Sequence, residues 1–190
     1  YQVVGGDLSA DMFHYAQLNT RCFLERGQAR FVQADATAFC LEERFGLVVA
    51  TFDALNHLPD LDALQKCCTC AAAVGDGYFV FDLNTRLGLR RWHSIEVDDS
   101  CEEMTVVNHG IYELTPERAW MKVTGFVRNA DGIYEHFEQT AYNTVFALAD
   151  VKAALLATGW QSVYFARLQD LRTPLADPEA EGRVFVVAQK

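Results

Sequence analysis

The sequence predicts one α/β domain with a mostly parallel sheet, an antiparallel C-terminal hairpin and an inserted antiparallel β-meander. Short apolar runs alternate with segments of helical period in the first half of the chain, a pattern typical of parallel strands joined by right-handed helical crossovers. Between residues 95 and 145 the pattern changes to β-branched and aromatic residues with turn residues between the runs, which indicates antiparallel strands. The 190 residues contain no repeat, low-complexity tract or linker, so we expect a single domain over 1–190.

The first half of the chain is expected to contain four buried strands and two helices. Apolar runs place the strands at residues 1–7, 29–35, 45–52 and 78–84. The helices are expected at 9–26 and 60–74, where apolar residues recur at helical spacing. Ser9 is a candidate N-cap and Gly27 a candidate C′ residue for the first helix, and the Gly75-Asp76-Gly77 segment should break the second.

The second half is expected to begin with the meander and to end with a helix and a hairpin. Strands are predicted at 104–113, 119–129 and 133–145, with turns rich in Pro, Asn and Gly between them. The helix should cover 148–158 and end at Gly159. The last two strands, 162–168 and 183–188, are joined by a Pro-containing loop and should pair antiparallel.

Composition and charge favour a small-molecule partner. Half of the residues are hydrophobic (51%) and the formal net charge is −10. A surface of that sign repels a phosphate backbone, so we expect no nucleic-acid partner. No apolar run approaches the ~20 residues that span a bilayer, so we expect no membrane partner.

The six cysteines are expected to be structural. Cys67 and Cys70 have the CxxC spacing of zinc and redox sites, but no second pair completes a metal site. The segment has a helical pattern, in which cysteines behave as small buried hydrophobic residues. We therefore expect no metal, and a reducing, cytoplasmic location.

Acidic residues end several of the predicted parallel strands. Asp7, Asp35 and Asp82 each end a strand, and Thr51-Phe52-Asp53 ends another. The carboxyl ends of parallel strands share one edge of a sheet, where open α/β sheets bind ligands. The Asp7 carboxylate could accept hydrogen bonds from a ribose diol. The alternative is that Asp7 only caps the following helix, alone or beside Ser9.

With these acids in this order, the sequence resembles the class I S-adenosylmethionine (SAM)-dependent methyltransferases, in particular their small-molecule branch. The matching stretches are residues 6–12, 33–36, 45–58, 157–160 and 183–190. The resemblance covers nearly the whole chain, and the meander is its least specific part. It implies a Rossmann-like methyltransferase sheet, SAM as the cofactor and an activity of the EC 2.1.1 type.

The resemblance also implies a role for each matching residue. Asp7 would hold the ribose hydroxyls and Asp35 the adenine amino group. The other residues expected at the cofactor are Leu8, Met12, Ala36, Thr51 and Phe52. Asn56 and His57 would face the substrate.

Two histidines are candidate general bases. Transfer of a sulfonium methyl by in-line attack needs no metal, and it needs a base only when the nucleophile arrives protonated. His57 could act as that base, or it could only cap or pack its loop. His136 is the second candidate, and it shares one face of a predicted strand with Tyr134 and Glu138. That face could line a substrate pocket or simply be the solvated face of the sheet.

The resemblance implies two parts that the printed sequence does not show. The family's first strand and its glycine-rich loop are expected upstream of Tyr1. The strand would lie between the strands that end at Asp7 and at Phe52. Without it, two apolar strands would have unpaired inner edges, which folded proteins avoid.

Three functions fit the sequence. The first is a SAM-dependent methyltransferase that moves a methyl group to N, O or C of a small-molecule acceptor. The second is a nicotinamide-dependent Rossmann oxidoreductase, in which an acid after the second strand also holds a ribose. The third is a non-catalytic, methyltransferase-like scaffold or binding domain. In each case the meander offers a surface for a homodimer.

Overall fold

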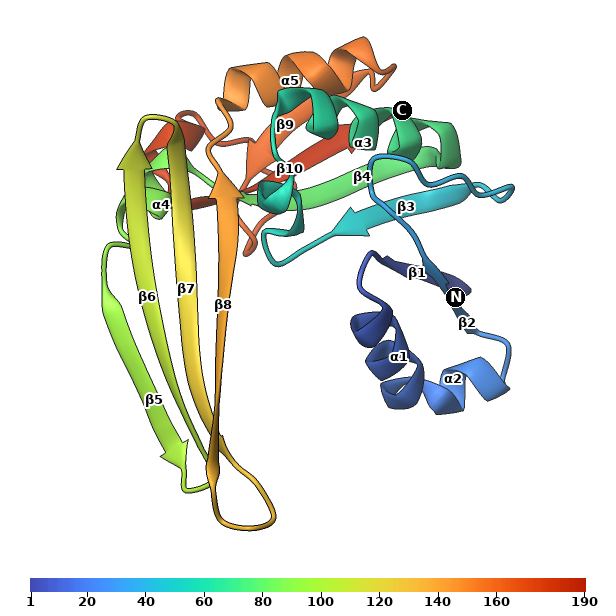
Figure 1. Cartoon of the computed structure of the whole chain (residues 1–190). Coiled ribbons are helices and arrows are strands. Elements are labelled where there is room, and N and C mark those ends of the chain that lie inside the picture. Colours follow the sequence, from blue (N-terminus) through green and yellow to red (C-terminus); the bar gives the residue numbers. More distant parts are fainter.

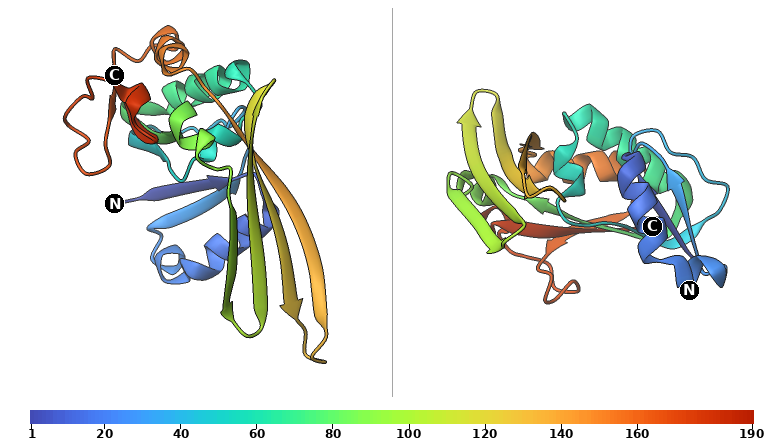
Figure 2. Two further views of the ribbon diagram at one scale, coloured as in Figure 1. Left: turned by 90° about the vertical axis from the view of Figure 1, so that its left-hand side faces the viewer. Right: turned by 60° about the horizontal axis from the view of Figure 1, so that its bottom comes forward.

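The protein consists of an α/β body and a long antiparallel sheet that extends away from it (Figures 1 and 2). The computed structural model describes the backbone of residues 1–190 and the side chains of 1–98 and 102–190. Within these described residues, no helix is long and apolar enough to cross a membrane.

The body is built on a four-stranded sheet in the order β3-β4-β10-β9. β3 (Phe45–Ala50) and β4 (Gly75–Asn84) are parallel. β10 (Arg183–Gln189) is antiparallel to both β4 and β9 (Ser162–Ala166). The predicted parallel strands and the antiparallel terminal hairpin are therefore confirmed.

The helices α3 (Leu61–Val74) and α5 (Leu148–Ala157) lie together on one face of this sheet (Figure 1). Asp60 caps α3 by accepting a hydrogen bond from the Ala63 amide at 2.8 Å. The core between the helices and the sheet consists of fully buried apolar side chains, among them Leu64, Phe79, Phe81, Val151, Leu155 and Trp160. Burying one such side chain contributes about 1.5–3 kcal/mol, so this contact is the main source of stability in the body.

Two of the described cysteines belong to this core. Cys67 and Cys68 are buried, and burial raises the pKa of each to about 12. The five described cysteines are all free, and no group of potential metal ligands occurs among the described residues. Cys101 lies outside the described side chains.

The segment around Gly75 differs from the prediction. Gly75 is both the C-cap of α3 and the first residue of β4. The Gly75-Asp76-Gly77 segment is therefore the start of the strand and not a separate break between helix and strand. A Cβ atom on Gly77 would collide with the backbone of Gly46. The glycine therefore permits the close approach of β3 and β4 at this end.

A smaller unit precedes the body in the chain. β1 (Val3–Asp7) and β2 (Ala29–Gln33) form a parallel pair. The single helix predicted between them is divided at Thr20 into α1 (Ala10–Asn19) and α2 (Arg21–Glu25). Thr20 has φ −114° and ψ 16°, outside the helical region, and its hydroxyl donates to the Ala16 carbonyl at 2.6 Å.

The ends of this helical segment confirm two predicted signals. The Ser9 side chain accepts a hydrogen bond from the Met12 amide at 3.3 Å, as an N-cap does. Gly27 has a φ of +66°, which an L side chain rarely adopts.

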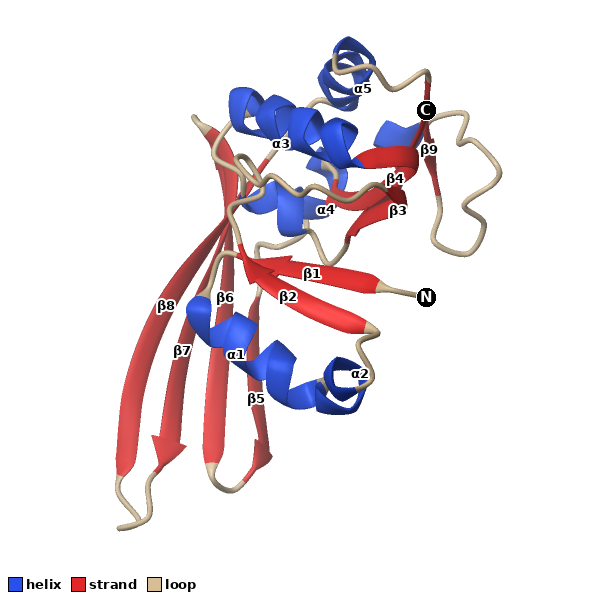
Figure 3. Ribbon diagram, turned by 90° about the vertical axis from the view of Figure 1, so that its right-hand side faces the viewer, coloured by secondary structure: helices blue, strands red, loops and turns tan.

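β1 and β2 form a sheet of their own. β1 pairs with β2 and β3 pairs with β4, and neither pairs with the other. Figures 1 and 3 show the β1–β2 pair beyond β3, on the side away from β4. Val3, Leu47 and Val49 are each more than half exposed here. The prediction that a further strand lies between β1 and β3 stays a prediction.

The meander forms the third sheet. β6 (Met104–Leu114), β7 (Glu117–Arg128) and β8 (Tyr134–Thr144) confirm the three predicted strands. The structure adds β5 (Ile95–Cys101) at the edge and the short helix α4 (Arg86–Arg90) before it. The sheet order β5-β6-β7-β8 follows the chain. Two 3-10 turns, η1 (Ala54–His57) and η2 (Pro178–Ala180), complete the structure.

Candidate functional site

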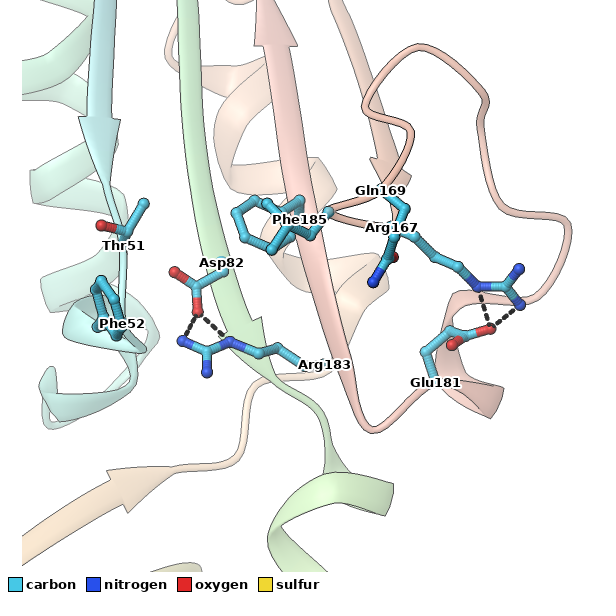
Figure 4. A pocket seen from close by; sticks show the side chains of 9 residues that line it. Thr51, Phe52, Asp82, Arg167, Gln169, Glu181, Arg183 and Phe185 are labelled. Atoms are coloured by element: carbon cyan, nitrogen blue, oxygen red, sulfur yellow. Dashed lines mark hydrogen bonds and ion pairs between the residues drawn. The ribbon is translucent and has the colours of Figure 1, made fainter.

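A cleft of about 640 Å³ lies at the carboxyl ends of β3 and β4. Figure 4 shows its side chains in two groups, with the Asp82–Arg183 pair near Thr51 and Phe52 and the Arg167–Glu181 pair on the other side of β10. Its lining residues are Thr51, Phe52, Asp82, Arg167, Leu168, Gln169, Glu181, Arg183 and Phe185. Two of the predicted cofactor residues, Thr51 and Phe52, are among them.

Asp82 and Arg183 form the centre of this cleft. Asp82 lies directly opposite Phe185 in the β4–β10 register, which places Arg183 two residues away on the same face. The Arg183 guanidinium donates from Nε to Asp82 Oδ2 at 2.5 Å, and its Nη2 also contacts that oxygen. The Asp82 side chain is completely buried, so loss of Arg183 would leave a buried charge without its partner, at a cost of roughly 3–5 kcal/mol.

The turn after β3 is held in a strained conformation. Phe52 and Asp53 have φ values of +62° and +50°, which are unusual for residues other than glycine. The Asp53 amide donates to Asp82 Oδ2 at 3.0 Å and so fixes this turn to the end of β4. As a result the Phe52 side chain is 82% exposed at the mouth of the cleft. Strained turns of this kind concentrate at functional sites.

Asp53 lies at the junction of the body and the meander. Its carboxylate forms an ion pair with Arg183 Nη2 at 3.6 Å. Burial raises the pKa of Asp53, and the positive charge of Arg183 opposes that effect. A hydrogen bond from the Asn143 side chain also favours the charged form. The site therefore contains a partly buried carboxylate that is easier to protonate than an exposed one.

His57 is fixed by the meander. Its Nδ1 lies 2.8 Å from the Tyr142 carbonyl oxygen on β8. Because a carbonyl oxygen only accepts hydrogen bonds, this contact assigns the proton of the neutral ring to Nδ1. Nε2 then carries the lone pair, and the side chain is exposed. His57 can therefore accept a proton at Nε2.

Asn56 has a different role from the predicted one. Its side chain is completely buried. Nδ2 donates to the Asn84 and Thr144 carbonyls at 3.2 and 3.0 Å, and Oδ1 accepts from the Asn84 amide at 2.9 Å. The sequence predicts that Asn56 faces a substrate. Because its polar groups are occupied, it instead joins η1, the end of β4 and the end of β8.

Asp7 and Asp35 lie at the ends of neighbouring parallel strands, as predicted. Asp7 Oδ1 accepts from the Ser9 amide at 2.8 Å, and its second oxygen has no partner among the described residues. Asp35 Oδ1 accepts from the Thr37 amide at 2.7 Å and from its hydroxyl at 2.8 Å, which lowers the pKa of Asp35. Each acid therefore keeps one oxygen for a ligand.

Asp35 also lines a second cleft, of about 360 Å³. The other lining residues are Val32, Gln33, Ala34, Ala38, Phe39, Cys40 and Leu41. Ala36 is partly buried against the core beside this cleft. Leu8 and Met12, which follow Asp7, are 68% and 55% exposed. A carboxylate beside apolar side chains such as Val32 and Phe39 can hold a flat ring that carries an amino group.

The structure does not bring His136 to this site within one chain. Its ring lies 5.2 Å from the Phe126 ring, on the outer half of the meander. His136 precedes Thr144 by eight residues along β8, which corresponds to about 26 Å in an extended strand. The assignment of His136 as a base stays a prediction.

Sequence reasoning gave no role to Arg183 or Gln169 and no chemistry to Asp82. The sequence did contain a signal for the pairing of Arg183 with Asp82. Arg183 begins the last strand and Asp82 ends its expected neighbour, so an antiparallel pairing in this order places them together. For Gln169 the sequence contains no such signal, because a long loop follows it.

Comparisons with known proteins agree with this architecture. No family model and no curated protein matches the sequence. Among solved structures, an S-adenosylmethionine-dependent methyltransferase from Clostridium acetobutylicum superposes with a TM-score of 0.82 at 18% identity, covering 100% of this chain and 75% of that chain.

Two further structures have the same fold. A sugar N-methyltransferase from Streptoalloteichus gives a TM-score of 0.74 at 22% identity, covering 98% of this chain and 71% of that one. A SAM-bound amino pentose methyltransferase from Micromonospora echinaspora gives 0.69 at 21% identity, covering 99% and 73%. At these identities the likeness establishes the fold, and the predicted Rossmann-like methyltransferase sheet is confirmed.

Proposed function

We propose that the protein is a SAM-dependent methyltransferase that transfers a methyl group to N, O or C of a small-molecule acceptor. One observation carries the proposal. Asp7 and Asp35 end adjacent parallel strands with one carboxylate oxygen each left for a ligand, in a fold shared with SAM-dependent methyltransferases. The second cleft beside Asp35 and the larger cleft at Thr51 then suit a cofactor and an acceptor.

The residues present fit the cofactor. Asp7 would hold the ribose, and Asp35 with Ala36 would hold the adenine in the cleft after β2. The exposed side chains of Leu8, Met12, Thr51 and Phe52 would complete its surroundings. When bound, SAM supplies an electrophilic methyl group on sulfur.

His57 is the candidate general base. Its Nδ1–H is held by the Tyr142 carbonyl, so Nε2 is the nitrogen that would take a proton from an acceptor amine or hydroxyl. An acceptor that already offers a lone pair would need no such step. The remaining catalysis would then come from positioning and from exclusion of water.

We further propose that a strand of the same protein, expected upstream of Tyr1, pairs between β1 and β3 as part of the same domain. The unpaired facing edges of these strands and the exposed Val3, Leu47 and Val49 support this. The glycine-rich loop would follow that strand at the edge that carries Asp7.

The meander would join two copies of the chain. The sheet face with Gly110, Ala119 and Asn143 packs toward the body, and all three residues are buried. The opposite face carries the exposed side chains of Ile95, Val97, Phe126 and Tyr142. An exposed apolar face of this kind is typical of a contact between subunits.

The free cysteines support the proposal of a reducing, cytoplasmic compartment.

Isothermal titration of the full-length protein with S-adenosylhomocysteine and with NAD tests the function. We expect binding of S-adenosylhomocysteine and no binding of NAD. Binding of NAD alone would identify a nicotinamide-dependent oxidoreductase, and binding of neither would identify a non-catalytic scaffold.

A further inference from the structure

The outer face of the meander carries two pairs of aromatic rings. Near the body, the Trp120 ring lies 4.9 Å from the Tyr142 ring, and toward the tip the Phe126 ring lies 5.2 Å from the His136 ring. The β7–β8 register pairs Trp120 with Tyr142 and Phe126 with His136, so all four side chains share one face. This face therefore has an aromatic pair at each end, six residues apart along both strands.

The middle of the outer face is charged on β7 and β8 and apolar on β5. Lys122 Nζ and Glu138 Oε2 form an ion pair of 2.9 Å. Ile95 lies in the cross-strand row of Lys122 and Val97 in the row of Glu138, and they are 65% and 60% exposed. The midpoint between the two aromatic pairs falls between these two rows.

A two-fold axis at this midpoint matches the outer face with itself. An axis that lies in the plane of the contact, perpendicular to the strands, reverses the strand direction and keeps each strand over its own copy. It places Phe126 over Trp120 of the partner subunit and Ile95 over Val97 of the partner subunit, so apolar side chains face each other. The two charged side chains in the middle lie over threonines of the partner.

The shape of the chain favours this orientation of the axis. The meander extends far beyond the body (Figure 1). An axis along the strands would bring the two bodies to the same end of the contact, where they would compete for the same space. With the perpendicular axis the bodies lie at opposite ends. The tip of each meander then reaches the body of the other chain.

The body end of the outer face is continuous with the candidate acceptor site. The Tyr142 carbonyl binds His57 Nδ1 at 2.8 Å, and the Thr144 hydroxyl donates to the Leu58 carbonyl at 2.6 Å. The two-fold axis places His136 of the partner subunit over Tyr142. It therefore brings that imidazole next to the segment that carries His57.

We infer that the acceptor site is formed by two copies of the chain, with His136 of the partner subunit facing His57; this rests on the proposed methyltransferase function and on the proposed homodimer. Packed sheets lie about 10 Å apart, which leaves room for an acceptor between the two rings. His57 takes the acceptor proton at Nε2, and the second imidazole binds the acceptor from the other side by a hydrogen bond. Both predicted histidines then serve one site, although a single chain holds them apart.

Cross-linking of two single variants tests this arrangement. His57→Cys and His136→Cys are co-produced as full-length chains and treated with a bismaleimide that spans about 10 Å, the spacing of packed sheets. Because each chain carries only one introduced thiol, a tryptic peptide that joins positions 57 and 136 must come from two chains. We expect mass spectrometry to identify this peptide as the main product of the introduced thiols.

Val127→Cys in place of His136→Cys is the matched control. Val127 lies near the same end of the meander and is 38% exposed, but it belongs to the opposite face. Its cross-link to position 57 should be at least about tenfold weaker, because the sheet separates the two thiols. Equal yields would overturn the inference. So would a monomeric protein in sedimentation equilibrium, or a dimer without the cross-link between positions 57 and 136.

A second measurement connects His136 to the site itself. Mixed dimers contain one chain with isotope-labelled histidines and one unlabelled chain. The NMR signal of the labelled His57 ring should shift when the unlabelled chain carries His136→Gln. It should not shift when that chain carries His14→Gln, since His14 lies on α1. A His57 signal that ignores His136→Gln contradicts the shared site.

S-adenosylhomocysteine binding is measured separately on the same samples. The cross-link and the NMR shift do not require the cofactor. If both occur without binding of S-adenosylhomocysteine, the methyltransferase proposal fails and the two-chain arrangement stands. If binding occurs without them, the methyltransferase proposal stands and the shared site fails.

Discussion

Asn56 and His57 are neighbours in the chain, yet the structure uses their side chains differently. Asn56 is completely buried and forms three hydrogen bonds to the backbone. His57 uses only Nδ1 and keeps Nε2 toward solvent. The 3-10 turn η1 therefore has one residue that fixes it and one that can react. The same division occurs within Asp82, where Oδ2 is occupied and the buried Oδ1 has no hydrogen-bond partner among the described residues.

At Asp7 we predict a loss of cofactor affinity. Asp7→Ala should weaken S-adenosylhomocysteine binding by roughly 1–3 kcal/mol, because it removes a charged hydrogen-bond acceptor. Isothermal titration measures this change. Asp11→Ala is the control, since Asp11 is an exposed acid in the first turn of α1. Equal affinities of Asp7→Ala and the wild type would remove Asp7 from the cofactor site.

At His57 we predict a loss of turnover without a loss of binding. His57→Gln should lower kcat by about 10²- to 10⁴-fold, the contribution of a general base. Its affinity for S-adenosylhomocysteine should stay within about twofold of the wild type. His14→Gln on α1 serves as the control histidine. If kcat of His57→Gln is unchanged, the acceptor reaches the site with its lone pair free and the His57 role is only structural.

Among the elements, α4 connects the body to the meander through one acidic side chain. Arg86 donates to Glu117 from Nε at 2.7 Å and from Nη2 at 2.9 Å, and Tyr112 donates its hydroxyl to the same carboxylate. The Arg86 hydrogen bonds lower the pKa of Glu117. Glu117 begins β7 and Tyr112 lies on β6, so this cluster holds the two strands to α4.

Glu117→Gln should therefore destabilise the protein at neutral pH. We expect the free energy of unfolding to fall by about 1 kcal/mol. A hydrogen bond to a charged group can contribute more than this, but the Arg86 side chain is 37% exposed and solvent screens its charge. Because the pKa of Glu117 is lower in the folded state, its charge stabilises the fold at pH values above the unfolded-state pKa of about 4.3. This stabilisation is lost as the pH falls through the folded-state pKa. The difference between Glu117→Gln and the wild type should therefore shrink in acid.

Urea unfolding at pH 7 and at about pH 3.5, which lies below the ordinary glutamate pKa, measures this prediction. Glu113→Gln is the control, because Glu113 lies on β6 of the same sheet and forms no ion pair with any of the described residues. If Glu117→Gln lowers the free energy of unfolding equally at both pH values, the charge of Glu117 is not the source of the stabilisation.

The order of these elements could largely be predicted from the sequence, since it depends on local pattern. The apolar runs gave the parallel strands, and Ser9 and Gly27 gave the ends of the first helical segment. The division at Thr20 was not predicted, because the helical sequence pattern is continuous across this residue.

For the candidate site, the acids at the strand ends followed from the chain order alone. The uses of Asn56 and Asp82 did not, because both depend on partners far away in the sequence. Asn56 bonds to Thr144, and Asp82 bonds to Arg183. Residue types and spacing show that a polar group is present at the edge of the sheet. Only the packed structure shows which of its atoms remain free.

For the whole molecule, the extended meander has two faces of different character. Adjacent residues of β7 alternate between these two faces. Phe126 lies on the outer face, as Val97 does, whereas Val127 lies on the face that continues toward the body. Their exposures are similar, at 41% for Phe126 and 38% for Val127. These two positions therefore form a matched pair for testing which face, if either, contacts a second copy.

We predict that Phe126→Lys dissociates a homodimer and that Val127→Lys does not. A lysine buried in a two-fold interface without a partner costs several kcal/mol, and a symmetric interface contains the substitution twice. The Kd of the Phe126→Lys dimer should therefore rise by more than about 100-fold. Sedimentation equilibrium of the full-length protein measures it. A wild type that is monomeric at about 100 μM, where a stable dimer would be assembled, contradicts the dimer proposal. Equal dissociation of the two variants would show that the outer face is not the interface.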